Sequence, residues 1–247
     1  SKNINDMSIV KIKLLATLTL MTMFMSCNDE ITQPKKSLLE SAYVNNSVNE
    51  LDAFILEWNS NVHPISVSEL SLLSDTLKCI YELYKSYYDP LNLYKYSITG
   101  PYPETGNNFY QAIPYIIIQN QINYKIGDSD STFILMNFRP QLEIDSVSLL
   151  FLTDKYKNEM LQFLDDPNFE NEWHEIMMFL NQRIKIYIRH YNMGWHLVTF
   201  PEIEEIKFNN NLDTAIVSFR ILFEGGNSKL IRTINGWEMI ESYLWWI

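Results

Sequence analysis

The four histidines are the residues whose spacing is most easily tested for metal chemistry. His174-Glu175 begins the His-Glu-x-x-His pattern that holds zinc, but Met178 stands where the second histidine is required. His190 and His196 could converge across a hairpin, yet a catalytic zinc site takes three protein ligands. The histidines therefore do not predict a metal site.

A calcium loop is the second metal site to consider. Asp128, Asp130 and Thr132 have the spacing of its first three ligands. Phe133 stands where the loop needs glycine, and Arg139 where it needs a bidentate glutamate. The sequence also lacks the glycine-rich nucleotide-binding patterns and the G-x-S-x-G nucleophile turn. We therefore expect no metal site, no cofactor and no catalytic residues.

Several carboxylates are of the type used in acid–base catalysis. They are Asp165 and Asp166, and the group Glu202, Glu204 and Glu205. Nothing in their spacing brings two of them to one reacting atom, so the sequence favours solvated surface charges.

The tyrosines of residues 90–110 are the strongest candidates for binding. This segment is rich in Tyr, Pro, Gly and Asn, which predicts a long loop, and long loops in compact domains are often functional. Exposed aromatic rings stack on sugars and anchor protein interfaces. We expect Tyr94, Tyr96 and Tyr102 to bind a ligand; the alternative is that they pack over a sheet.

The start of the chain has the pattern of a secretory signal. Lys11 and Lys13 precede an uncharged apolar stretch, Leu14–Met25. As a helix this stretch is roughly 18 Å long, whereas a bilayer core needs about 30 Å. A cleavable signal is therefore favoured over a membrane-spanning helix.

Phe24-Met25-Ser26-Cys27 resembles a bacterial lipobox, in which the signal is cut before a cysteine that carries lipid. Asn28-Asp29-Glu30 resembles the acidic tag that sends lipoproteins of Bacteroidetes-type bacteria to the cell surface. These resemblances imply a signal peptide over 1–27, lipid on Cys27, a tether over 28–37, and a body over 38–247 outside the outer membrane. The alternative is a plain secretory signal with an incidental cysteine, or a periplasmic location.

Composition limits the partners of the body. The formal charge is −11 for the whole chain, and it becomes −13 when residues 1–26, with three lysines and one aspartate, are removed. An acidic body without a basic cluster argues against nucleic-acid binding. Hydrophobic residues make up 47% of the chain, which supports a substantial core. If Cys27 carries lipid, Cys79 has no disulfide partner and packs as a small apolar side chain.

Apolar spacing predicts four helices. Capping-box patterns at Ser47–Glu50 and Ser66–Glu69 open the first two, and Asp89-Pro90 ends the second. Two more are predicted over 153–164 and 170–182. Alternating or continuous apolar runs predict strands over 113–126, 132–138, 147–152, 184–189, 195–200, 203–208, 214–223, 228–234 and 237–246.

The last four strands are separated by short polar turns, including Asn235-Gly236, which predicts an antiparallel meander. Gly236-Trp237-Glu238-Met239 resembles the end of NTF2-like and cystatin-like proteins, and the resemblance covers about 170–247. The expected fold class is α+β, with N-terminal helices (within 38–110) and a curved antiparallel sheet (within 111–247). Trp195-His196 before "FPEIEEIKF" also resembles uncharacterised Bacteroidetes lipoproteins.

Three functions stay open at this point. The first is a non-enzymatic envelope lipoprotein that binds a partner protein or a glycan. The second is an immunity-type or inhibitor lipoprotein whose acidic face neutralises a toxin. The third is a small-molecule enzyme that uses an NTF2-like cavity.

Overall fold

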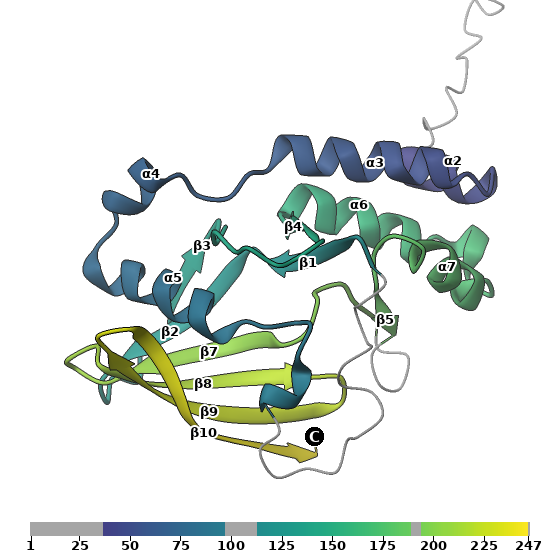
Figure 1. The fold of residues 1–247 in the computed structure, drawn as a ribbon. Coiled ribbons are helices and arrows are strands. Elements are labelled where there is room, and N and C mark those ends of the chain that lie inside the picture. The colour runs from purple at the N-terminus through teal and green to yellow at the C-terminus, as the bar shows by residue number, and fades with distance from the viewer. Residues whose placement is uncertain (1–36, 97–112, 189–193, 247) are drawn as a thin grey trace, which may run out of the picture. The chain divides into compact units, whose positions relative to one another are not determined.

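The computed structural model describes residues 37–96, 113–188 and 194–246, and residues Ser37–Ile247 form one compact unit of the α+β class (Figure 1). Its α-helices are α2 (Leu38–Val44), α3 (Val48–Asn61), α4 (Val67–Ser71), α5 (Asp75–Tyr87), α6 (Asp154–Leu164) and α7 (Trp173–Leu180). Two short 3-10 helices are η1 (Leu93–Tyr96) and η2 (Pro167–Phe169). The strands are β1 (Tyr115–Gln119), β2 (Gln121–Ile126), β3 (Phe133–Met136), β4 (Ser148–Leu152), β5 (Tyr187–Ile188), β6 (Trp195–His196), β7 (Glu202–Phe208), β8 (Thr214–Ile221), β9 (Glu224–Thr233) and β10 (Gly236–Trp246).

The largest sheet has six strands in the order β10-β9-β8-β7-β2-β3. The predicted meander is confirmed, because β7 to β10 pair antiparallel in sequence order. β2 and β3 also pair antiparallel, as a hairpin. The sheet as a whole is mixed, since β2 runs parallel to β7, with Tyr124 opposite Ile206.

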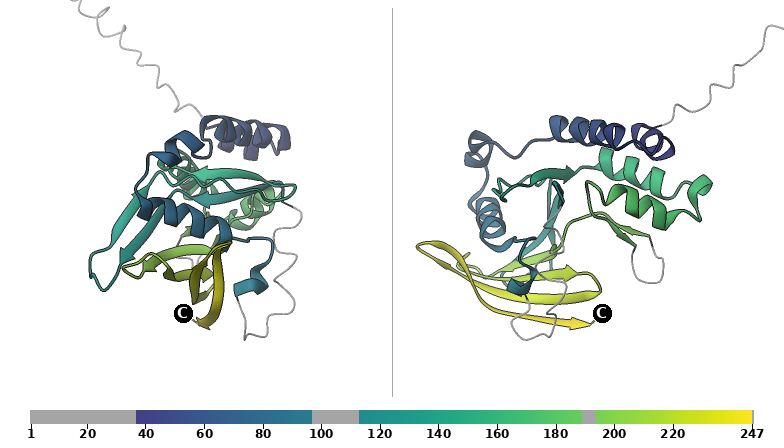
Figure 2. Two further views of the ribbon diagram at one scale, coloured as in Figure 1. Left: turned by 60° about the vertical axis from the view of Figure 1, so that its left-hand side comes forward. Right: turned by 45° about the vertical axis from the view of Figure 1, so that its right-hand side comes forward.

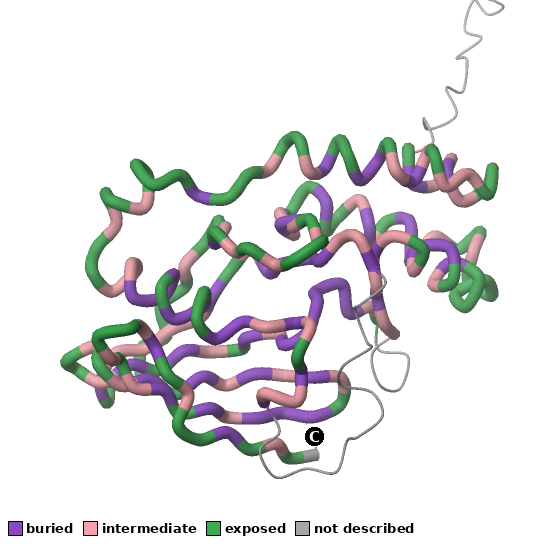
Figure 3. The backbone as a smooth tube through the Cα atoms, viewed as in Figure 1, coloured by how far each residue is buried: buried purple, intermediate pink, exposed green. Residues whose placement is uncertain are grey.

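One face of this sheet packs against α5 (Figure 2). Buried and exposed positions alternate along the strands of the sheet (Figure 3). On β8, Val217 and Phe219 are fully buried, whereas the side chain of Ile216 is 42% exposed. This alternation follows from the period of two in a strand, which sends successive side chains to opposite faces. The core on the α5 side also includes Cys79, which is buried and not in a disulfide.

A second core lies among α2, α3, α6 and α7. Strand β1 separates the two cores: Ile116 and Ile118 belong to the core under α5, and Ile117 to the other. Its parallel partner β4 does the same with Leu150 and Phe151. A strand buried on both faces reads as a continuous apolar run, which explains the sequence of this segment.

The single strand predicted over 113–126 is in fact two strands that break at Asn120. β1 pairs only with β4, whereas β2 joins the large sheet. The amide of Gln119 holds the junction together, because its Nε2 donates to the carbonyls of Gln121 (2.9 Å) and Ile203 (2.8 Å) and its Oε1 accepts from the Ile203 N–H at 2.7 Å. The Gln119 side chain thus makes the hydrogen bonds to backbone groups that strand pairing would have made in an unbroken β-sheet.

The helix predicted from Ser66 onward is also divided. Ser66 and Glu69 form the expected reciprocal capping box, but α4 ends after five residues. A new N-cap at Ser74, whose side chain accepts from the Leu77 N–H at 3.4 Å, then starts α5. Ser and Asp side chains compete for backbone hydrogen bonds inside a helix. Ser74-Asp75 therefore favours the start of a new helix over the continuation of α4.

Other helix boundaries agree with the sequence or differ in simple ways. The helix predicted over 153–164 is confirmed as α6, and that over 170–182 is α7, shortened at both ends. The structure adds α2, a seven-residue helix capped by Ser37, which the sequence did not predict.

The strands predicted over 184–189 and 195–200 are shorter in the structure, where they are the two-residue strands β5 and β6. The signal and residues 28–36 of the tether lie outside the described residues, whereas Ser37, the last residue of the predicted tether, caps α2.

Candidate functional site

A cleft of about 590 Å³ opens where the end of α6, η2, the start of α7 and the β5–β6 hairpin meet. Its size falls in the range of small-molecule sites, roughly 300–1,000 Å³. The residues that line it are Leu164, Asp165, Asp166, Pro167, Phe169, Glu170, Trp173, Ile188, Gly194 and Trp195. The described part of the lining therefore combines three aromatic rings with three carboxylates, and it includes no Lys or Arg.

Two tryptophans supply apolar surface in the cleft. Trp173 is the first residue of α7 and is 47% exposed, because the core that covers later turns of the helix does not reach it. Trp195 is partly buried on β6, where Ile188 pairs with it. Phe169 packs edge-on against Tyr43 and Phe163, with ring centroids 5.3 and 5.8 Å away, so its position is fixed from behind.

The carboxylates are held at defined positions. Oδ1 of Asp165 accepts a hydrogen bond from the indole Nε1 of Trp195 at 3.1 Å. Asp165 is itself the C-cap of α6, and its N–H donates to Leu161 at 2.9 Å. Oδ1 of Asp166 accepts from the Asn168 N–H at 2.8 Å and caps η2. Each carboxylate keeps lone pairs that can accept further hydrogen bonds.

This arrangement suits a ligand that has both hydroxyl groups and flat apolar faces. Indole rings bind such faces by burying apolar area, and carboxylates accept from hydroxyls. The two aspartates already accept protein N–H groups, which holds their carboxylates in place as hydrogen-bond acceptors.

The tyrosines expected to bind a ligand lie elsewhere. Tyr96 is fully buried, its hydroxyl donating to the Tyr87 carbonyl at 2.6 Å and accepting from the Asp89 N–H at 2.7 Å. Burial raises the pKa of Tyr96 well above its usual value. The expectation that Tyr96 binds a ligand is thus wrong. Tyr96 packs over the sheet, which was the alternative to ligand binding. Tyr94 is partly buried beside it, and Tyr102 lies outside the described residues.

The histidines and the β7 glutamates form a different environment. His196 is buried, stacks on Phe200 with ring centroids 4.2 Å apart, and has its Nδ1 3.5 Å from Oε2 of Glu202. His190, its expected neighbour, lies outside the described residues. Glu204 pairs with Arg220 at 2.8 Å, and Glu205 pairs with Lys125 at 2.8 Å. These two glutamates are surface ion-pair partners.

A smaller cleft of about 400 Å³ lies at the β1–β2 junction, next to these glutamates. Amides and charged groups line much of it, among them Gln119, Asn120, Asp154, Lys157 and Glu202. None of the described residues that line it is aromatic, so they offer less apolar area to a ligand than the tryptophan cleft does. Among the residues that the structure describes, no group of three His, Cys, Asp or Glu side chains comes together to hold a metal ion.

Sequence reasoning did not single out the tryptophans. Trp173 lies three residues before Ile176 and seven before Leu180, so it fits the apolar stripe of α7 and is assigned to the core. The spacing of Asp165 and Asp166 predicted only solvated surface charges. One sequence feature could have indicated the exposure of Trp173. The acidic segment 165–172 comes directly before it, and at the start of a helix no preceding helical turn covers the indole ring.

Comparison with known proteins gave no match: no family model, no curated protein and no solved structure is similar to this chain. The resemblance of residues 170–247 to NTF2-like and cystatin-like proteins stays a prediction. None of the helices built from described residues is long and apolar enough to cross a bilayer.

Proposed function

We propose that this protein is a lipid-anchored protein of the bacterial envelope that binds carbohydrate without altering it. The tryptophan cleft is the observation that carries the proposal. Trp173 and Trp195 offer ring surface for stacking, and Asp165, Asp166 and Glu170 offer acceptors for sugar hydroxyls. Sugar rings present an apolar face and a rim of hydroxyls, which is the chemistry that this lining complements.

Anchoring rests on the sequence. Lys11, Lys13 and Leu14–Met25 have the order of a secretory signal, and Cys27 ends the lipobox-like segment. Acyl chains contribute about 0.8 kcal/mol per buried CH₂, so two or three chains on Cys27 hold an acidic body at an outer membrane without a spanning helix. A binding protein at the cell surface meets polymeric carbohydrate from the surroundings, which agrees with a cleft that is open to solvent.

A glycan array tests the carbohydrate proposal directly. The soluble body should bind at least one oligosaccharide class, and Trp173→Ala and Trp195→Ala should each weaken that binding about tenfold, or about 1.4 kcal/mol. Trp245→Ala is the matched control, because Trp245 on β10 is 42% exposed and lies outside this lining. No bound glycan, or an equal loss in the Trp245 variant, would contradict the proposal.

A further inference from the structure

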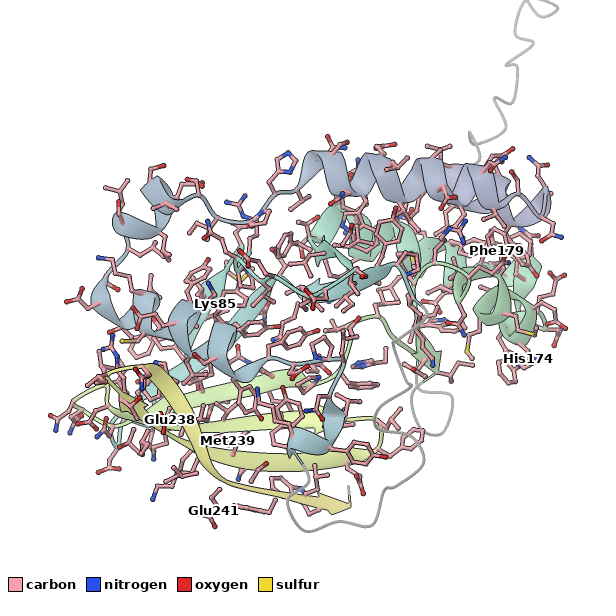
Figure 4. All side chains as sticks on the ribbon, in the orientation of Figure 1. Lys85, His174, Phe179, Glu238, Met239 and Glu241 are labelled. Atoms are coloured by element: carbon pink, nitrogen blue, oxygen red, sulfur yellow. The ribbon has the colours of Figure 1, made fainter. Side chains whose placement is uncertain are left out.

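A second concave surface lies between α2 and α7, next to the tryptophan cleft. This groove has a volume of about 730 Å³ and shares only Phe169 with the cleft. Tyr43 and Val44 line it from α2, and Met178 and Phe179 line it from α7. Figure 4 labels Phe179 on the part of α7 near α2, and His174 on the far part of the same helix.

The floor of the groove is rigid. The ring of Tyr43 makes edge-on contacts with Phe163, Phe169 and Phe179, with centroid distances of 5.6, 5.3 and 5.7 Å. The Tyr43 hydroxyl donates to Oε2 of Glu172 at 2.6 Å. Burial and the Glu172 carboxylate raise the pKa of Tyr43. The contacts that shape the groove all lie within this protein.

Two apolar side chains at the groove remain in water. Met178 is 62% exposed and Val44 is 51% exposed, although both are adjacent to the aromatic floor. Methionine is flexible and polarisable, and it is common on surfaces that bind other proteins. Apolar surface on a concave site marks a place where a partner can exclude water.

Among the described residues that line the groove, the two charged side chains, Glu172 and Glu175, are acidic. Helices α2, α3 and α7 contain no Lys or Arg. They and the residue before α7 carry the acidic side chains Glu40, Glu50, Asp52, Glu57, Glu172 and Glu175. Arg183 pairs with Asp52, and Lys155 pairs with Glu57 at 2.9 Å, so these two cations are already engaged. Anionic lipid or nucleic acid would be repelled from such a surface, whereas Lys and Arg side chains would be attracted.

We propose that this groove docks a basic amphipathic segment of a partner protein. An apolar side chain of the segment sits on Tyr43 and Met178, and its Lys or Arg side chains lie against Glu172 and Glu175. This is the helix-in-groove mode, with apolar anchors for affinity and charges for orientation. The interaction goes beyond carbohydrate binding, since the residues that carry it lie outside the tryptophan cleft.

Fluorescence anisotropy with a labelled helical peptide of leucine and lysine, roughly 18 residues or five turns long, tests the proposal. The soluble body should bind it, and binding should weaken as salt rises. Met178→Ser should weaken binding about fivefold and Glu175→Gln about threefold, since each removes one contact class. Control variants are Ile134→Ser, at an exposed apolar residue on β3, and Glu241→Gln, at an exposed acid on β10.

A peptide with the same leucine spacing and glutamate in place of lysine should not bind. The proposal is overturned if the lysine peptide does not bind, if the glutamate peptide binds equally well, or if the controls lose as much affinity as the groove variants. Trp195→Ala should leave peptide binding unchanged, and Met178→Ser should leave glycan binding unchanged. The two sites can therefore fail independently.

Discussion

The indole Nε1 of Trp195 donates a 3.1 Å hydrogen bond to Oδ1 of Asp165, thirty residues earlier in the chain. This bond joins β6 to the C-terminal end of α6 and fixes the orientation of the indole ring in the cleft. Trp195 thereby presents a preorganised surface, which lowers the entropic cost of binding a ligand.

Replacing Asp165 should therefore weaken carbohydrate binding even where the ligand does not touch it. We expect Asp165→Ala to lower affinity about tenfold, since both an acceptor and the indole partner are lost. Asp165→Asn keeps an acceptor for the indole and should lose less. Isothermal titration of the two variants with an array-selected oligosaccharide measures the difference. Equal affinities in the wild type and Asp165→Ala would show that the bond has no positioning role.

Two buried tyrosines should respond in opposite ways to loss of the hydroxyl. Tyr96→Phe removes a hydroxyl that makes two hydrogen bonds and leaves their backbone partners unpaired, so we expect about 1–3 kcal/mol of destabilisation. The Tyr84 hydroxyl is buried and has no hydrogen-bond partner among the described residues, so Tyr84→Phe should be neutral or stabilising by about 1 kcal/mol. Urea unfolding of both variants tests this contrast, and equal destabilisation would contradict it.

Tyr84 also makes stability depend on alkaline pH. Burial, with a smaller contribution from Glu202, raises the pKa of Tyr84 well above its usual value. The unfolded chain releases this phenolic proton above pH of about 10 while the folded chain keeps it, so the free energy of unfolding falls as pH rises.

The free energy of unfolding of the wild type minus that of Tyr84→Phe should be constant below a pH of about 9.5. It should then fall by up to about 1.4 kcal/mol per pH unit above pH of about 10. Urea unfolding at a series of pH values from neutral to alkaline measures this difference. Parallel curves for the two proteins would show that the proton is released equally in both states.

Lipid attachment gives a prediction that is independent of the body. Expression in a bacterium that makes lipoproteins should yield a form acylated at Cys27, with residues 1–26 removed. Cys27→Ser should abolish the incorporation of labelled palmitate, and Cys79→Ser should not, because Cys79 is buried in the core. Mass spectrometry of the mature N-terminus shows whether Cys27 is acylated and whether residues 1–26 have been removed. An unmodified Cys27 with the leader still attached would refute the anchor.

Local sequence patterns predicted the elements with strong periodicity. The meander from Glu202 to Trp246 and helix α6 follow from alternation, turn residues and apolar stripes. The break at Asn120 could not be predicted, because an unbroken apolar run hides a change of partner strand. The pairing of β1 with β4 and the long-range contacts of Gln119 with Ile203 reveal it.

The candidate site was less visible than the fold. Its tryptophans obey the apolar patterns of their elements, so periodicity assigns them to the core. Their exposure arises from position, since Trp173 starts α7 and Trp195 lies in a two-residue strand at the margin of the second core. Tyr96 shows the opposite case, because an aromatic side chain in a predicted loop is fully buried against the sheet.

Binding of a fluorescent, array-selected glycan to cells that express the full chain tests the proposed function most directly. Flow cytometry should show glycan on cells with the wild-type protein and on cells with Trp245→Ala. Cells that display equal amounts of Trp195→Ala should retain about a tenth of that signal or less, and cells with Cys27→Ser should display neither protein nor glycan. Wild-type levels of glycan on the Trp195→Ala cells would contradict the assignment of the cleft as the binding site.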